Sequence, residues 1–240
     1  MKRIFLFLIV FLFFSSVFAY SQTLDLTKWT PYVANGSKIV SLEKDKVIFK
    51  IVRESSGPKG DPSTHGYAFL LSGPISLKKD WTKIEIEGVW WRDKGPKNYN
   101  EMNLYIFSKK PHYPHKLKKG QKPNTNFIGI SYETVFNDVR FEDMGVTKNK
   151  KTTKRIDRPI PTTPRPFKII IYHRGETWWE YWEKTKDKDW EKIYEQEVSF
   201  FLEGVDYPQD EIYFKIGGWT SWEHPVECMI HFERLNLKEE

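Results

Sequence analysis

The chain of 240 residues has little of what holds many small domains together, because Cys228 is its only cysteine. A disulfide scaffold is therefore excluded. Glycine and proline, at 14 residues each, are too few for a collagen-like or low-complexity chain. The sequence also lacks a glycine-rich phosphate loop and a Gly-x-Ser-x-Gly turn, so neither a P-loop nucleotide site nor an α/β-hydrolase nucleophile is expected.

The first 19 residues have the pattern of a secretory signal peptide. Lys2 and Arg3 precede an apolar run over residues 4–14, and residues 15–19 supply a small-residue cleavage site before Tyr20. The run is shorter than the roughly 18 to 20 residues that span a bilayer. An uncleaved anchor is the alternative. We expect a secreted protein, extracellular or on the cell surface, with no membrane attachment after cleavage.

Aromatic residues are plentiful, since 10 Trp, 12 Tyr and 17 Phe make up 16% of the chain. That much apolar surface excludes intrinsic disorder. Aromatic surface is also costly to leave in water unless a ligand covers it, so the excess indicates a binding protein. The formal net charge of +6 at pH 7 is modest for a chain with 38 basic and 32 acidic residues, and nucleic acid is not an expected partner.

Short runs of alternating apolar and polar residues dominate the chain after Tyr20, and no sustained helical periodicity accompanies them. Such runs are typical of half-buried antiparallel strands, and they occupy residues 46–53, 83–87, 103–107, 127–133, 167–174 and 212–215. Many such strands predict an all-β fold, an antiparallel two-sheet β-sandwich. Residues 190–201 fit a helix face as well as a strand, and the neighbouring strands favour the strand.

Two segments rich in charge and proline interrupt the strands, at residues 109–123 and 148–165. Proline keeps both out of central strands, so we interpret them as long loops of one domain that covers residues 20–240. The lysines of the first loop would stand at the rim of a groove and attract anionic glycans, but a solvated charged loop is the favoured interpretation.

The polar faces of the predicted strands carry rings and cations in place of the usual Lys, Glu, Thr and Ser. Rings pack on the apolar side of a sugar, while amide, guanidinium and ammonium groups bind its hydroxyls or carboxylates. The sequence therefore predicts a carbohydrate-binding groove, and the residues expected to line it are Trp91, Tyr105, Phe107, Tyr172, Arg174, Tyr213, Lys215 and Trp219. The alternative is a second packed layer of rings beneath the long loops.

Adjacent tryptophans raise a question of orientation. Trp90 is in phase with Ile84 and Ile86, which predicts Trp90 in the core and Trp91 outside. Trp178 and Trp179 belong to a run that is aromatic on both faces, so alternation leaves open which of the two is buried.

The sequence contains few patterns that are typical of catalytic or metal-binding sites. Glu85 and Glu87 share one strand face, as the carboxylates of a glycosidase can, but this spacing is common on charged strands. His112 and His115 lie in a proline-rich loop without an accompanying ligand set, and Cys228 is expected to be a buried small hydrophobe. We expect no catalytic residue, no metal site and no required cofactor.

Residues 166–237 resemble the concanavalin A-like lectin and glucanase jelly roll. Residues 167–175 are similar to that family's strand leading into a turn, and residues 178–182 to its returning strand. Residues 212–218 are similar to its strand end with two glycines, and residues 232–237 to its closing strand. The resemblance implies a jelly-roll sandwich with a concave binding sheet. It also allows a structural Ca²⁺, for which this sequence shows no clear ligand set.

One part of the match is sharper. The run Tyr213-Phe214-Lys215-Ile216-Gly217-Gly218-Trp219-Thr220-Ser221 resembles the Tyr-Phe-Lys-Ala-Gly-x-Tyr-Asn-Gln motif of jelly-roll lyases that act on uronate polymers such as alginate. In that family the lysine lines the groove and the second tyrosine is the catalytic acid and base. Here Trp219 stands at the position of that tyrosine, and the family's Gln-x-His pair would fall near Gly129 and Ser131.

Tryptophan cannot shuttle a proton at neutral pH, so the resemblance implies a shared groove and a preference for acidic glycans without lyase chemistry. The sequence thus predicts a secreted, non-catalytic carbohydrate-binding protein whose partner is a polysaccharide. One alternative is a lyase or endo-glycosidase of the same fold. Another is a surface structural or adhesion protein whose rings contact a second protein chain.

Overall fold

The computed structural model describes residues 20–53, 65–78, 80–93, 100–112, 125–146, 150–174, 176–185, 189–197, 199, 201, 211–220 and 226–240. The predicted signal peptide, residues 1–19, lies outside the described residues, as does His115. Within the described part, no helix is long and apolar enough to cross a membrane.

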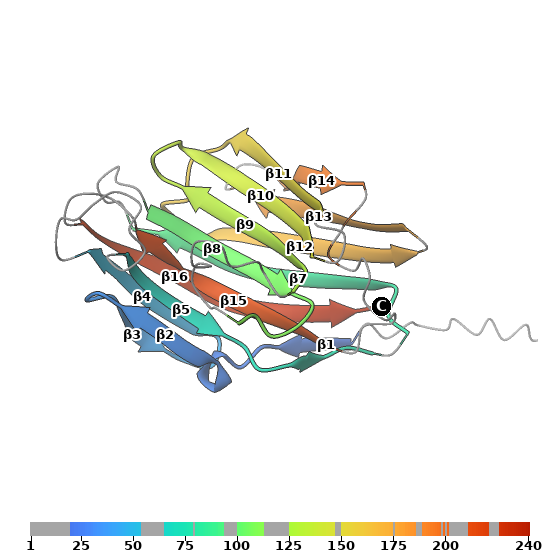
Figure 1. The fold of residues 1–240 in the computed structure, drawn as a ribbon, viewed down its shortest axis with the longest axis horizontal. Coiled ribbons are helices and arrows are strands. Elements are labelled where there is room, and N and C mark those ends of the chain that lie inside the picture. Colours follow the sequence, from blue (N-terminus) through green and yellow to red (C-terminus); the bar gives the residue numbers. More distant parts are fainter. Residues whose placement is uncertain are drawn as a thin grey trace, which may run out of the picture.

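The described residues form two antiparallel eight-stranded sheets, one stacked on the other (Figure 1). The first, sheet A, has the order β14 (Trp190–Gln196), β13 (Glu176–Lys184), β12 (Arg165–Arg174), β7 (Lys83–Arg92), β16 (Val226–Glu239), β4 (Lys46–Arg53) and β3 (Lys38–Leu42), with β1 (Tyr20–Thr23) also paired to β16.

The second, sheet B, has the order β11 (Lys150–Asp157), β10 (Asp138–Gly145), β9 (Phe127–Glu133), β8 (Asn100–Phe107), β15 (Glu211–Thr220), β5 (Gly66–Leu71) and β2 (Thr30–Ala34), with β6 (Ile75–Ser76) also paired to β15. The 3₁₀ turn η1 (Leu26–Lys28) connects β1 to β2. The predicted all-β, two-sheet sandwich is confirmed.

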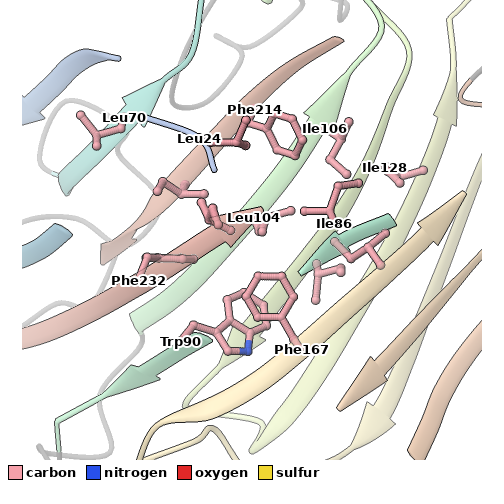
Figure 2. Packing of buried hydrophobic residues seen from close by; sticks show 14 of the residues in the cluster. Leu24, Leu70, Ile86, Trp90, Leu104, Ile106, Ile128, Phe167, Phe214 and Phe232 are labelled. Atoms are coloured by element: carbon pink, nitrogen blue, oxygen red, sulfur yellow. The ribbon is translucent and has the colours of Figure 1, made fainter. Parts of the chain in front are cut away.

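Alternation along the strands builds the core between the sheets. Figure 2 shows Trp90, Phe167 and Phe232 of sheet A together with Leu104 and Phe214 of sheet B, all buried in one cluster. Successive side chains of a strand point to opposite faces, so the inward residues meet as a continuous apolar layer. The core also contains the single thiol, Cys228, and burial raises its pKa to about 12, which leaves it unreactive at neutral pH.

The tryptophan pairs are resolved by this layer. Trp90 has no exposed surface and Trp91 is half-buried on the outer face, as the phase of β7 predicts. In β13, Trp179 and Tyr181 face the core with no exposed surface, so Trp178 and Trp182 face outward.

The prediction of a loop over residues 148–165 is wrong for its first half, because residues 150–157 form β11 at the edge of sheet B. Its lysines and threonines are largely exposed on both faces, so no alternation marks it as a strand. Charge on an edge strand hinders pairing with a second chain, which is the physical reason for this composition. Residues 190–196 form strand β14, as favoured, and most of the other predicted loop lies outside the described residues.

One polar contact connects the two sheets across the core. Glu183 of β13 has no exposed surface and accepts hydrogen bonds from the hydroxyls of Tyr132, in β9 of the other sheet, and Tyr181. Its second oxygen lies 2.6 Å from Arg158 Nε and 3.3 Å from Arg165 Nη1. Burial raises the pKa of both tyrosines, so they remain protonated donors. A buried carboxylate with four partners is fully compensated, and it joins the two sheets.

We predict that Glu183→Gln lowers the free energy of unfolding by about 3–5 kcal/mol, because it leaves two arginines beside a neutral amide. Urea unfolding at pH 7 measures the change. The control is Glu191→Gln, which removes the more exposed partner of Arg158 at 3.4 Å and should cost under about 1 kcal/mol. Equal losses in the two variants would contradict the role given to Glu183.

Candidate functional site

The eight residues expected to line one groove are divided between two opposite faces. Five of them lie on β8 and β15 of sheet B and point away from the core, namely Tyr105, Phe107, Tyr213, Lys215 and Trp219. Trp91, Tyr172 and Arg174 lie on β7 and β12 of sheet A, and the side chain of Arg174 lies outside what the structure describes. The single groove is therefore corrected, because alternation separates inward from outward residues without stating which sheet a strand joins.

Lys215 occupies the centre of the sheet B face. Its side chain is almost buried, and its ammonium nitrogen lies 4.3 Å from the ring centroid of Tyr105, 4.7 Å from that of Phe69 and 5.9 Å from that of Phe107. The rings attract the cation through their quadrupoles. Among the residues that the structure describes, no carboxylate forms an ion pair with it. Burial lowers the pKa of Lys215 to about 8, although Glu101 and Glu142 oppose this shift.

A cluster of charged side chains lies beside Lys215 and centres on Arg140 of β10. Its guanidinium forms ion pairs with Glu133, with Glu101 at 3.3 Å and with Glu142 at 3.7 Å. Arg155 adds a contact of 2.9 Å to Glu133 from the edge strand. Glu101 and Glu133 are 1% exposed and face each other across β8 and β9. Buried charge of this kind is tolerated only when it is paired, and Arg140 supplies the pairing.

Trp219 connects this cluster to the surface. Its indole Nε1 donates to Glu101 Oε2 at 2.7 Å, and its ring stacks on His65 with centroids 5.0 Å apart. The residue remains half-buried, and Tyr67 is its register partner on β5. Burial, and next the charge of Glu133, raise the pKa of Glu101 to about 7, while Arg140 lowers it. The Glu101 carboxyl therefore gains or loses its proton near neutral pH.

The two positions where the lyase resemblance expects Gln and His are filled differently. A Cβ on Gly129 would lie 2.3 Å from the Tyr105 ring, so that ring occupies the space a side chain at 129 would need. The Tyr105 hydroxyl lies 3.2 Å from Ser131 Oγ and donates to Glu142 Oε2 at 3.1 Å. Burial raises the pKa of Tyr105, with Glu142 as the next cause, and this is opposite to what a proton-abstracting tyrosine needs.

Sequence reasoning missed four polar groups on this face, which are His65, Glu101, Arg140 and Glu142. Glu101 shares its strand face with Tyr105 and Phe107, so alternation could have included it. The alternation of residues 127–133 places Glu133 on the outer face, but only the pairing of β8, β9 and β10 brings it to Arg140.

The residues placed on sheet A have other partners. Trp91 stacks on His231 with centroids 4.4 Å apart, and Tyr172 stacks on Trp178 at the same distance. Glu85 and Glu87, considered as a glycosidase pair, both form ion pairs with Lys168 and Lys238 at distances between 2.8 and 3.4 Å.

No group of three or more His, Cys, Asp or Glu side chains in the described part of the chain could hold a metal ion. The Ca²⁺ that the resemblance allows therefore finds no ligand set among these residues, and we assign no step to it.

Comparison with known proteins identifies the architecture. No family model matches the chain, and no curated protein matches its sequence. Among solved structures, arcelin-5, a lectin-like defence protein from Phaseolus vulgaris, is similar with a TM-score of 0.51 at 12% identity over 92% of this chain and 98% of its own. Lectin I from Ulex europaeus, in complex with a methyl glycoside of α-L-fucose, has a TM-score of 0.51 at 9% identity over 92% and 98%.

A variant of the family 7 alginate lyase A1-II′, in complex with product, gives a TM-score of 0.52 at 9% identity, and the match covers 90% of this chain and 97% of the lyase. Identities this low show a shared fold alone. The chain has the concanavalin A-like jelly-roll fold of the legume lectins and the alginate lyase.

Proposed function

We propose that this protein is exported and binds an acidic polysaccharide on the outer face of sheet B without cleaving it. The observation that carries the proposal is the state of Lys215. An almost buried ammonium group, enclosed by three rings and paired with no described carboxylate, is costly until an anion reaches it. The carboxylate of a uronate residue supplies that anion.

Unsatisfied acceptors beside Lys215 fit the hydroxyls of the same sugar. Glu101 Oε1 and Asn103 Oδ1 are buried and accept no hydrogen bond within the described part of the chain. Both residues are 1% exposed and stand two positions apart on one face of β8. A buried acceptor without a donor costs about 1–3 kcal/mol, and a sugar hydroxyl would remove that cost.

Half-buried rings extend the face on the side of β15, β5 and β2. Trp219 lies opposite Tyr67 in the register, and Tyr32 lies opposite Phe69 one strand further. Rings on neighbouring strands can stack on successive sugars, each for on the order of 1 kcal/mol. The glycan would then run across the strands, from these rings towards Lys215 and the charged cluster.

The geometry argues against the two enzyme alternatives. Lyase chemistry needs a group that abstracts a proton, and the described face offers Trp219, Gly129 and Ser131 where the resemblance expects the catalytic residues. Hydrolysis needs two carboxylates on either side of a glycosidic bond. The guanidinium of Arg140 pairs with both Glu101 and Glu133, so it occupies the space between the two carboxylates where a glycosidic bond would have to lie.

The proteins of similar fold support a carbohydrate ligand. Two are described with galactose and with a fucoside, and a third is an alginate lyase with its product. We assign none of these particular sugars to this chain. The choice of an acidic polymer rests on Lys215.

We expect Lys215→Met to weaken binding to sodium alginate or polygalacturonate by about ten-fold or more, since a charged hydrogen bond contributes about 1.5–3 kcal/mol. Trp219→Ala should weaken it by about five-fold, since a stacked ring contributes about 1 kcal/mol. Affinity electrophoresis of the mature chain measures the change. Trp178→Ala, which removes an indole from the opposite face, is the matched control and should bind as the parent does. Absorbance from unsaturated uronate products would overturn the non-catalytic role.

The affinity for these acidic polymers should fall as pH rises from 6 to 9. Glu101, whose pKa is about 7, gains a negative charge over this range, and Lys215, whose pKa is about 8, loses its positive charge. Both changes disfavour an anion. Titration calorimetry at fixed ionic strength measures the profile, which Lys215→Met should flatten in its upper part. Lys154→Met, on the exposed edge strand, should leave the profile unchanged, and a parent affinity independent of pH would contradict the assignment.

A further inference from the structure

A pocket of about 210 Å³ opens on the outer face of sheet A, on the side of the molecule away from Lys215. It lies where β16 departs from regular pairing with β7, because the register shifts between Glu233 and Asn236 and Arg234 adopts a φ of 54°. A bulge leaves residues unpaired and bends the strand, which here makes room above β7. The side chains that line the pocket include Glu87, Val89, Pro166, Trp190, Arg234 and Asn236.

One half-buried indole lines this pocket, and two more lie on the same face of sheet A. Trp190 of β14 forms one wall, and Lys168 Nζ lies 4.7 Å from its ring centroid and holds it there. Trp182 is the register partner of Lys168 on β13. Trp91 follows Val89 on the same face of β7, about 7 Å along the strand. Indoles gathered on the outer face of a sheet indicate a ligand surface, because a solvated sheet face is normally polar.

The charges next to the pocket are already compensated. Lys238 lies 3.1 Å from Glu85 and 2.8 Å from Glu87, and Lys168 lies 3.4 Å and 3.2 Å from the same two carboxylates. Lys83 adds a third base, 3.9 Å from Glu85, so each of these three lysines has a carboxylate partner, unlike Lys215 on sheet B. The carboxylate of Glu87 at the wall also repels an anion. The lining has one acid, Glu87, and one base, Arg234, so its formal charges cancel and a neutral sugar fits best. The Asn236 amide and the Arg234 guanidinium are the lining groups that can bind its hydroxyls.

We infer that sheet A carries a second carbohydrate site, specific for a neutral sugar residue that stacks on Trp190 in the pocket at the β16 bulge. The two faces point in opposite directions and differ in charge. One protein molecule would therefore connect a neutral polysaccharide on sheet A to an acidic one on sheet B.

The test screens neutral polymers, namely galactomannan, xylan, laminarin and mixed-linkage β-glucan, by affinity electrophoresis with the mature chain. At least one should be retained, and Trp190→Ala should weaken its binding about five-fold or more. A second variant, Arg234→Gly, removes the guanidinium at a positive φ that glycine accepts without strain, and it should weaken the same interaction. Retention by the parent should persist in high salt, whereas retention on alginate should not.

Matched variants separate the two sites. Trp178→Ala, on the same face but four residues from Trp182 along β13, should bind the neutral polymer as the parent does, and Trp219→Ala should lose only alginate. An alginate-coated plate should capture the neutral polymer through the parent chain, and through neither Trp190→Ala nor Trp219→Ala.

The second site is overturned if no neutral polymer is retained, or if Trp190→Ala and Arg234→Gly, with parental melting temperatures, retain it unchanged. If the parent chain retains a neutral polymer but does not bind alginate, the site on sheet B is contradicted and the site on sheet A is not. Failure of the two proposals is thus distinguishable.

Discussion

Glu183 joins the two sheets at the point where the apolar layer between them contains polar groups. Its carboxylate accepts hydrogen bonds from Tyr132 of sheet B and from Tyr181 of its own strand, while Arg158 reaches it from the segment after β11 and Arg165 from the start of β12. The outer face depends on this contact because a strand positions its two faces together. Strand β9 directs Tyr132 inward to Glu183 and directs Ser131 and Glu133 outward. The contact between Tyr132 and Glu183 on the inner side therefore fixes the position of the charged cluster on the outer side.

The two outer faces differ in how their charged groups are buried and paired. On sheet B the carboxylates of Glu101 and Glu133 are buried and depend on Arg140, and Lys215 has rings as its neighbours. On sheet A, Glu85 and Glu87 share two lysines in an open network. Burial strengthens each interaction and also the cost of each missing partner, so an unpaired group on sheet B is a stronger indication of a ligand than one on sheet A. On sheet A the shape of the pocket and the Trp190 indole in its wall indicate the ligand instead.

The division of the predicted groove shows where reasoning from the sequence ends. Alternation placed Trp91 and Tyr105 outside the core, and both positions are confirmed as outward-facing. It could not show that β7 and β8, consecutive in the chain, belong to different sheets. The edge strand β11 was missed for a related reason, since exposure of both its faces removes the period of two. Glu133 and Arg140 become neighbours only through pairing between β9 and β10.

The sequence by itself determined the fold class, the strands that carry half-buried faces and the burial of Trp90, because one residue in two must enter the core whichever strands are neighbours. It also excluded a disulfide scaffold, since Cys228 has no partner cysteine. Only the tertiary structure decided which outward side chains meet. The pairing of β8 with β9 and β15, and the bulge of β16 against β7, depend on contacts between residues far apart in the chain. Local periodicity contains no information about such contacts, and the charged cluster, the cage around Lys215 and the pocket beside Trp190 all arise from them.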